Sequence, residues 1–244
     1  MGAGDDLMAS GIAGRLHAMT NEPVMIHGSD GKPRWSDVWD GLMYVTHDVF
    51  ARSHIINGPS VRQYYSRLEG NRILWRNWDI APGDIRLTNE ERAWAAEMTA
   101  HMDPRFIVVE SRFKEKGGGG VNKAWPYWSE FLNAPLGIAQ FWMRDLPSFR
   151  HACAILERSI GYVGHEGGLH HAAAALGKPA VVIFGGYISP EVTGYPEHTN
   201  LYSPDERYPL GCGTVTPCEH CKESMSKITV EHVVTAVREM INAI

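Results

Sequence analysis

The chain of 244 residues lacks any apolar run near the length of about 18 to 20 residues that a membrane-spanning helix needs, so no transmembrane segment is expected. Its first residues, MGAGDD, carry acids where a secretory signal needs positive charge, which favours a cytoplasmic location. Basic residues are not in excess, because 23 Lys and Arg oppose 28 Asp and Glu. Bulk charge therefore gives no reason to expect nucleic acid as a partner.

Cysteine is scarce: four residues at this length do not indicate a disulfide scaffold. Three of them lie in CGTVTPCEHC, together with His220 (Cys212, Cys218 and Cys221). A zinc site prefers four ligands, and the chain has no second C-x2-C pair. Zinc therefore remains an alternative, and reduced structural thiols are the simpler interpretation.

Several nucleotide and metal motifs are also missing. No Asp-x-Asp motif stands at the end of a predicted strand, so we expect no catalytic metal and no cofactor. No strand–GxGxxG–helix unit is present, which disfavours an oxidoreductase of the Rossmann type. The glycine run in GGGGVNKAWP lacks the GK[ST] ending of a P-loop.

The residues that are present predict a packed α/β chain, since 44% are hydrophobic and 21% charged. Strand-like and helix-like segments alternate in the second half of the chain. We predict strands at 105–111, 136–142, 160–164 and 179–185, and helices at 126–133, 146–159, 167–177 and 229–244. This alternation favours a parallel, doubly wound sheet, which binds ligands at the carboxyl ends of its strands.

The first half of the chain is less regular. The apolar spacing there predicts helices at 6–19, 60–68 and 87–102 and strands at 23–28 and 41–46, while 71–78 is ambiguous between strand and loop.

The stretch GYVGHEGGLHHAAAALGKPAVVIFGG, residues 161–186, is the strongest candidate for a ligand site. In the turn Glu166-Gly167-Gly168, glycines let a ligand approach the backbone, and the first N–H groups of the next helix attract phosphate. Glu166 is placed to accept hydrogen bonds from sugar hydroxyls. His170 and His171 point about 100° apart on a helix, so we expect one to face the ligand. A capped packing helix is the alternative.

Three further positions extend this candidate site. The strand before Gly185 and Gly186 gives a second glycine edge, which makes a diphosphate pocket the expectation and ordinary loop chemistry the alternative. Lys123 follows strand 105–111, where an ammonium group can neutralise phosphate charge. Asp5 and Asp6 open the first helix, either as caps or as a general base at a domain cleft.

Four segments resemble, in the same order, glycosyltransferase family nine, the ADP-heptose:lipopolysaccharide heptosyltransferases. VGHEGGLHHAAAALGKPAVVIFGG is similar to the nucleotide-sugar-binding segment of that family, and NKAWP to its Lys-x-Trp-Pro element. GAGDDLMASG resembles its N-terminal Gly-Asp loop. CEHCKESMSKITVEHVVTAV resembles its tail, where a cysteine-containing loop precedes a helix. The likeness covers residues 100–244 and about the first 15.

The resemblance implies a GT-B-like α/β fold of two Rossmann-like domains with parallel sheets. The N-terminal domain is expected to be reduced, because the chain is shorter than the family's members. Residues 1–95 would form the acceptor-side domain, and residues 96–244 the nucleotide-sugar-binding domain.

The implied reaction is the metal-independent, inverting transfer of a sugar from a nucleotide diphosphate donor. ADP-heptose is one candidate donor, and the acceptor would be a saccharide or glycolipid of lipopolysaccharide biosynthesis, which leaves peripheral membrane contact open. A non-catalytic nucleotide-sugar or glycan-binding module is the alternative.

The resemblance also assigns roles to individual residues. Asp5 corresponds to the general base, because it follows Gly4 directly, and Asp6 is then expected to cap the helix. Lys123 corresponds to the lysine near the donor phosphates. The expected donor-binding residues are Glu166, Gly167, Gly168, His171, Gly185 and Gly186.

Overall fold

The C-terminal half of the chain builds a five-stranded sheet in the computed structural model, which describes residues 2–28, 30–57, 63–112 and 119–244. The strand order is β10-β9-β8-β6-β7, and every neighbouring pair is parallel. The strands are β6 (Phe106–Glu110), β7 (Ala139–Trp142), β8 (Gly161–His165), β9 (Ala180–Phe184) and β10 (Thr199–Tyr202). The predicted parallel sheet is therefore confirmed, and β10 is an additional strand in a segment expected to be loop.

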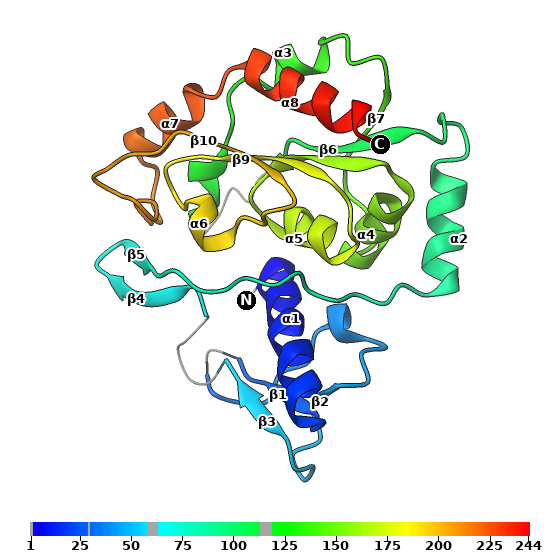
Figure 1. Cartoon of the computed structure of the whole chain (residues 1–244), viewed down its shortest axis with the longest axis vertical. Helices are drawn as coiled ribbons and strands as arrows, with labels where there is room; N and C mark the ends of the chain where they lie inside the picture. Colours follow the sequence, from blue (N-terminus) through cyan, green and yellow to red (C-terminus); the bar gives the residue numbers. More distant parts are fainter. Residues whose placement is uncertain (1, 29, 58–62, 113–118) are drawn as a thin grey trace.

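Helices cover both faces of this sheet (Figure 1). Side chains alternate between the faces along each strand. Ile107 and Val109 of β6 pack in one apolar cluster with residues of α3 (Trp128–Leu132) and α8 (Val230–Asn242). Phe106 and Val108 belong to the other cluster, which includes residues of α4 (Phe149–Arg158) and α5 (Gly168–Ala175). Burial on both faces explains the continuous apolar runs FIVV in β6 and AVVIF in β9.

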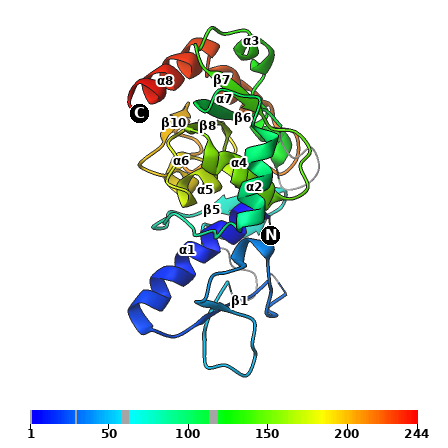
Figure 2. The same ribbon diagram turned by 90° about the vertical axis from the view of Figure 1, so that its right-hand side faces the viewer.

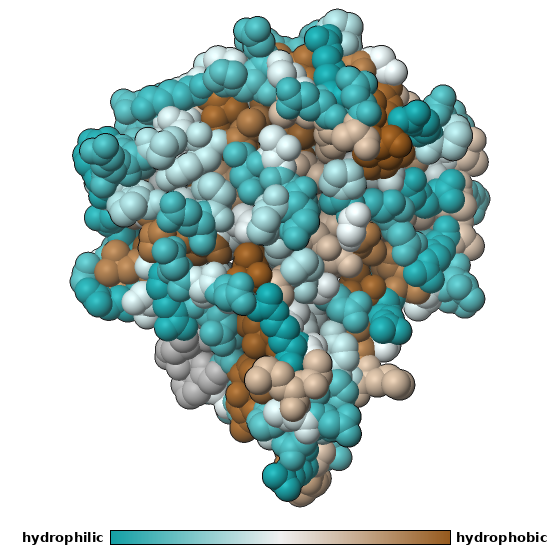
Figure 3. All heavy atoms as spheres, viewed as in Figure 1, coloured by the Kyte–Doolittle hydropathy of each residue, from teal (hydrophilic) through white to brown (hydrophobic). Residues whose placement is uncertain are grey.

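The N-terminal part is a smaller α/β unit. Helix α1 (Ala3–Thr20) is followed by β1 (Val24–Ile26), η1 (Asp37–Trp39), β2 (Val45–Thr46) and β3 (His54–Ile56). The three strands form a parallel sheet in the order β2-β1-β3. The expected architecture, an α/β chain with two parallel sheets of which the N-terminal one is reduced, is confirmed. An apolar strip crosses this part of an otherwise mostly hydrophilic face (Figure 3).

Both ribbon views place the N-terminus at the junction of the two units (Figure 2). The start of α1 meets the start of α5 there. A Cβ atom on Gly4 would lie 2.8 Å from the His171 ring and 3.3 Å from the Gly168 Cα, so this close approach requires glycine. The turn at 166–168 and the Gly-Asp segment, far apart in sequence, are therefore neighbours in space.

The helix expected at 60–68 is wrong over its described part, while 60–62 lie outside the described residues. Residues 65–68 belong to β4 (Tyr65–Glu69), which pairs antiparallel with β5 (Arg72–Trp75). Gly70 takes a φ of +60° in the connecting turn, a conformation that favours glycine. Turn chemistry thus outweighed a short, helix-like spacing of apolar residues. The segment 71–78, for which both strand and loop were considered, contains the strand β5 near its start.

Other differences lie in loops. The strand expected at 41–46 is confined to Val45–Thr46, because Gly41 has a φ of +83° and turns the chain. Helix α2 (Asn89–Met98) is capped by Thr88, with Glu91 completing a capping box. Helices α6 (Pro190–Thr193) and α7 (Glu219–Ser226) lie where only loop was expected. In the part of the chain that the structure describes, no helix has the length and apolarity needed to cross a bilayer.

Candidate functional site

A cavity of about 700 Å³ opens at the carboxyl ends of β6 and β8, beside the N-termini of α1 and α5. Its lining includes six of the eight residues expected to form the site: Asp5, Lys123, Glu166, Gly167, Gly168 and His171. Parallel strands bring their carboxyl ends to one edge, which accounts for the residues that follow β6 and β8. Asp5 reaches the cavity through the contact between α1 and α5.

Glu166 is the centre of the charged groups in the cavity wall. The Lys123 ammonium donates a hydrogen bond to its carboxylate, and His171 Nε2 lies 3.5 Å from Oε1 of the same group. The Glu166 side chain is only 7% exposed. Burial opposes ionisation, but Lys123 and His171 outweigh it and lower the pKa of Glu166 well below its ordinary value. Glu166 is therefore a carboxylate that accepts hydrogen bonds.

Only one of the paired histidines lines the cavity, as expected, although their ring centroids lie 4.8 Å apart. His171 lines the cavity, and its Nδ1 lies 2.9 Å from the Tyr195 hydroxyl. His170 is fully buried against the rings of Phe184, Tyr195 and His198 and is not part of the lining. Burial lowers the pKa of His170 well below its ordinary value, so it belongs to the core as a neutral ring.

The two acids at the start of α1, Asp5 and Asp6, have different surroundings. The half-buried Asp5 carboxylate lines the cavity and accepts hydrogen bonds from the Gly2 amide, at 2.8 Å, and from the Tyr64 hydroxyl. Asp6 is buried instead between Arg34 and Ser36, each 2.8 Å from Oδ2. The expectation that Asp6 caps the helix is therefore wrong, since Asp5 makes the capping bond. Burial raises the pKa of Asp6 although Arg34 and Ser36 oppose it.

Gly185 and Gly186 do not line the cavity. A Cβ atom on Gly185 would lie 2.8 Å from the Met225 side chain, and one on Gly186 would lie 2.5 Å from His220. Both contacts are with α7, so these glycines permit the close packing of that helix. The structure thus does not bring the second glycine edge together with the other expected donor-binding residues.

Glu110 is a cavity residue that the sequence reasoning missed. It ends β6, and the Tyr162 hydroxyl donates a hydrogen bond of 2.8 Å to its carboxylate. Burial raises the pKa of Glu110 to about 7. The available signal was an acid directly after the buried run FIVV, at the edge where ligands bind.

We expect Glu110→Gln to change how stability depends on pH. The folded state holds the Glu110 proton up to a pKa of about 7, whereas the ordinary value is 4.5. Folding therefore favours the protonated form, and the wild type loses stability as pH rises between these two values. Glutamine does not titrate, so the variant should gain stability relative to the wild type from about pH 5 to about pH 8. Chemical denaturation across this range measures the difference, and parallel curves would contradict the assignment.

Aromatic rings and two arginines complete the lining. Trp75 stacks on Tyr64, with ring centroids 5.9 Å apart, and meets Tyr187 edge-on at 5.3 Å. These three rings form a wall on one side of the cavity, held by a hydrogen bond from Trp75 Nε1 to the Tyr187 carbonyl. Arg112 and Arg144 add positive charge. Aromatic faces accept planar bases and sugar rings, and arginine suits phosphate oxygens.

Two groups among the described residues bring metal-binding side chains together. One is Glu166, His170 and His171, of which Glu166 and His171 line the cavity. The Lys123 ammonium contacts Glu166, so it occupies the place beside this carboxylate where a metal ion would otherwise bind. The other group is Cys212, Cys218, His220 and Cys221, outside the cavity.

No protein-family model and no curated protein matches the chain. Solved structures with a similar fold include ADP-heptose LPS heptosyltransferase II of E. coli, at 16% identity and a TM-score of 0.48, covering 70% of this chain and 55% of that one. A glycosyl transferase family 9 protein of Veillonella parvula is 14% identical, with a TM-score of 0.48 and coverage of 68% and 56%.

A third match is the iron-containing dodecameric glycosyltransferase TibC of enterotoxigenic E. coli, at 15% identity, a TM-score of 0.45 and coverage of 67% and 51%. The chain thus spans about half the length of the structures it matches. At identities of 14–16%, these likenesses concern the fold alone.

Proposed function

We propose that the chain is a glycosyltransferase that binds a nucleotide-sugar donor in the 700 Å³ cavity and transfers the sugar to a saccharide or glycolipid acceptor. The observation that carries the proposal is the convergence of Asp5, Lys123 and the start of α5 on this one cavity. Its volume lies within the range of small-molecule sites. Heptose is the candidate sugar and ADP the candidate nucleotide, by the sequence resemblance.

The donor diphosphate fits the edge formed by Gly167 and Gly168. Amide groups at the start of α5 point toward this edge, and the helix dipole favours negative charge there. Lys123 lies beside it, although it shares its charge with Glu166. The aromatic wall of Tyr64, Trp75 and Tyr187 offers apolar faces for the rings of the donor or acceptor.

The proposed reaction needs a base on one side of the sugar and a stabilised leaving group on the other. The Asp5 carboxylate takes the proton of the acceptor hydroxyl, whose oxygen attacks the anomeric carbon. The bond from that carbon to the diphosphate oxygen breaks, and the configuration inverts. Lys123 and the α5 amides stabilise the charge that develops on the diphosphate, in place of a metal ion.

We expect Glu166→Ala and His171→Ala each to weaken donor binding by about 1–3 kcal/mol, because each removes a buried or charged hydrogen-bonding group from the cavity wall. Calorimetry with nucleoside diphosphates and nucleotide sugars measures this and tests the proposed function. His101→Ala, an exposed histidine outside the cavity, is the matched control. Unchanged affinity in both cavity variants would overturn this placement of the donor. Binding without transfer by the wild type would support a binding module instead.

A further inference from the structure

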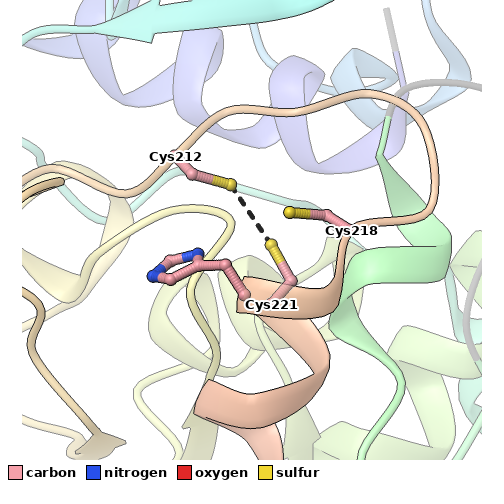
Figure 4. Close-up of side chains that lie close together, drawn as sticks. Cys212, Cys218 and Cys221 are labelled. Atoms are coloured by element: carbon pink, nitrogen blue, oxygen red, sulfur yellow. Dashed lines mark hydrogen bonds between the residues drawn. The ribbon is translucent and has the colours of Figure 1, made fainter.

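Three cysteines and a histidine gather beside α7. Cys212 lies in the loop after β10, Cys218 directly precedes α7, and His220 and Cys221 lie in its first turn. The three cysteine side chains point toward one another (Figure 4). One potential ligand atom from each of the four residues lies within 4.8 Å of all the others. None of the four lines the candidate site cavity.

The distances suit metal coordination better than a disulfide. Cys212 Sγ and Cys221 Sγ are 3.2 Å apart, whereas a disulfide bond measures about 2.05 Å. Thiolates that bind one zinc ion at about 2.3 Å with tetrahedral angles are separated by about 3.8 Å. The sulfur atoms would therefore move apart by about half an ångström to admit the ion.

His220 supplies the fourth ligand that the sequence pattern alone did not assign. Its Nε2 lies 3.1 Å from the Asp205 carboxylate, while its Nδ1 is buried and has no hydrogen-bond partner among the described residues. The carboxylate favours a proton on Nε2, which leaves the Nδ1 lone pair for a metal ion. Arg207 holds Asp205 in turn, with Nη2 at 2.6 Å. A histidine oriented by a carboxylate is the usual support of a metal ligand.

We propose that Cys212, Cys218, Cys221 and His220 form a tetrahedral site for a structural, thiophilic metal ion, with zinc the ion that this ligand set prefers. Protein side chains would fill all four coordination positions of the ion, so none is left open for a substrate. The His220 ring occupies the space that a side chain at position 186 would need, which accounts for the glycine there.

The proposed ion would brace one wall of the cavity. The Cys212 amide donates to the Gly186 carbonyl at 2.7 Å, and the next amide, of Gly213, donates to the Tyr187 carbonyl at 2.9 Å. The Cys218 amide donates to the Asn122 side chain at 3.0 Å, and Asn122 directly precedes Lys123. The metal loop thus contacts the segments that carry two cavity residues without reaching the cavity itself.

Elemental analysis of the purified full chain tests the site without any activity assay. We expect zinc at about one ion per chain, with elemental iron measured in the same sample as the other thiophilic candidate. Cys218→Ser should lower the metal content at least about tenfold, because only three ligands remain. Cys153→Ala is the matched control: Cys153 is a buried free cysteine in α4, outside the cluster, and this variant should keep the metal.

Reconstitution with cobalt gives a second measurement that does not depend on the metal acquired during expression. The wild type and Cys153→Ala should show the intense visible absorption of tetrahedral cobalt thiolate, and His220→Ala should show an altered spectrum. Metal-free wild type that also fails to bind cobalt would overturn the proposal. So would a Cys212–Cys221 disulfide in the unreduced protein, or metal retained in full by Cys218→Ser. Because the readout is metal content, the result is independent of whether the chain transfers sugar.

Discussion

Replacing Asp5 with asparagine should reduce sugar transfer by about 10²–10⁴-fold, the usual contribution of a general base. Asparagine keeps the shape of the side chain and can still accept the hydrogen bond from the Gly2 amide, but it cannot take a proton from the acceptor. Donor affinity should hardly change, because the proposed diphosphate contacts lie at Lys123 and the start of α5. A radiolabelled-sugar transfer assay beside donor calorimetry separates the two effects.

Full turnover by Asp5→Asn would show that Asp5 is not the base. Glu110 is then the next carboxylate to test, since it lines the same cavity. Its pKa of about 7 would give a transfer rate that rises with pH through neutrality, provided that deprotonated Glu110 is the base. The pH profile of the wild type and of Glu110→Gln therefore distinguishes the two carboxylates.

The neighbouring substitution Asp6→Asn should act on stability and leave the chemistry largely intact. It removes one partner of the ion pair with Arg34 and presents an amide to a guanidinium group that has only donors. Breaking a buried pair costs about 3–5 kcal/mol. The Arg34 side chain is 27% exposed and can recover part of its hydration, so we expect a loss of about 2–3 kcal/mol.

Denaturant titration of Asp6→Asn, Arg34→Met and the double variant measures this interaction. If the pair is coupled as the contacts indicate, the double variant should lose less stability than the sum of the single variants. Additive losses would mean that Asp6 and Arg34 act separately. Asp5→Asn is the control at the adjacent position, and it should cost at most about 1 kcal/mol through the cap.

The sequence predicted the C-terminal sheet well because the physical signal there is strong. Strands β6, β8 and β9 are buried on both faces, and short connections join β8 and β9 to the helices α4 and α5 around them. The hairpin β4–β5 gave no such signal. Its strands are short and partly exposed, and they pack on a distant part of the chain, with Arg72 Nε donating to the Cys212 carbonyl at 2.9 Å. Local spacing cannot reveal a partner 140 residues away.

The candidate site was predictable where a turn, a helix start and a strand end coincide, as at Glu166. Glycine was less informative: at Gly167 and Gly168 it lines a cavity, whereas at Gly185 and Gly186 it admits a helix. The sequence pattern is the same in both places, because a ligand and a packed helix both need the absence of a Cβ atom. Glu110 was missed because an acid after a strand is most often a solvated surface group.

The contact of Gly4 with Gly168 and His171 also has a consequence for folding kinetics. It joins two positions separated by most of the chain, so its formation carries the entropy cost of closing a very long loop. Long-range contacts of this kind slow folding. The parallel sheet, with its shorter connections, can form before α1 docks on α5. The face around Glu166 and Gly167 would then exist before Asp5 arrives, and the complete cavity would be among the last features to assemble.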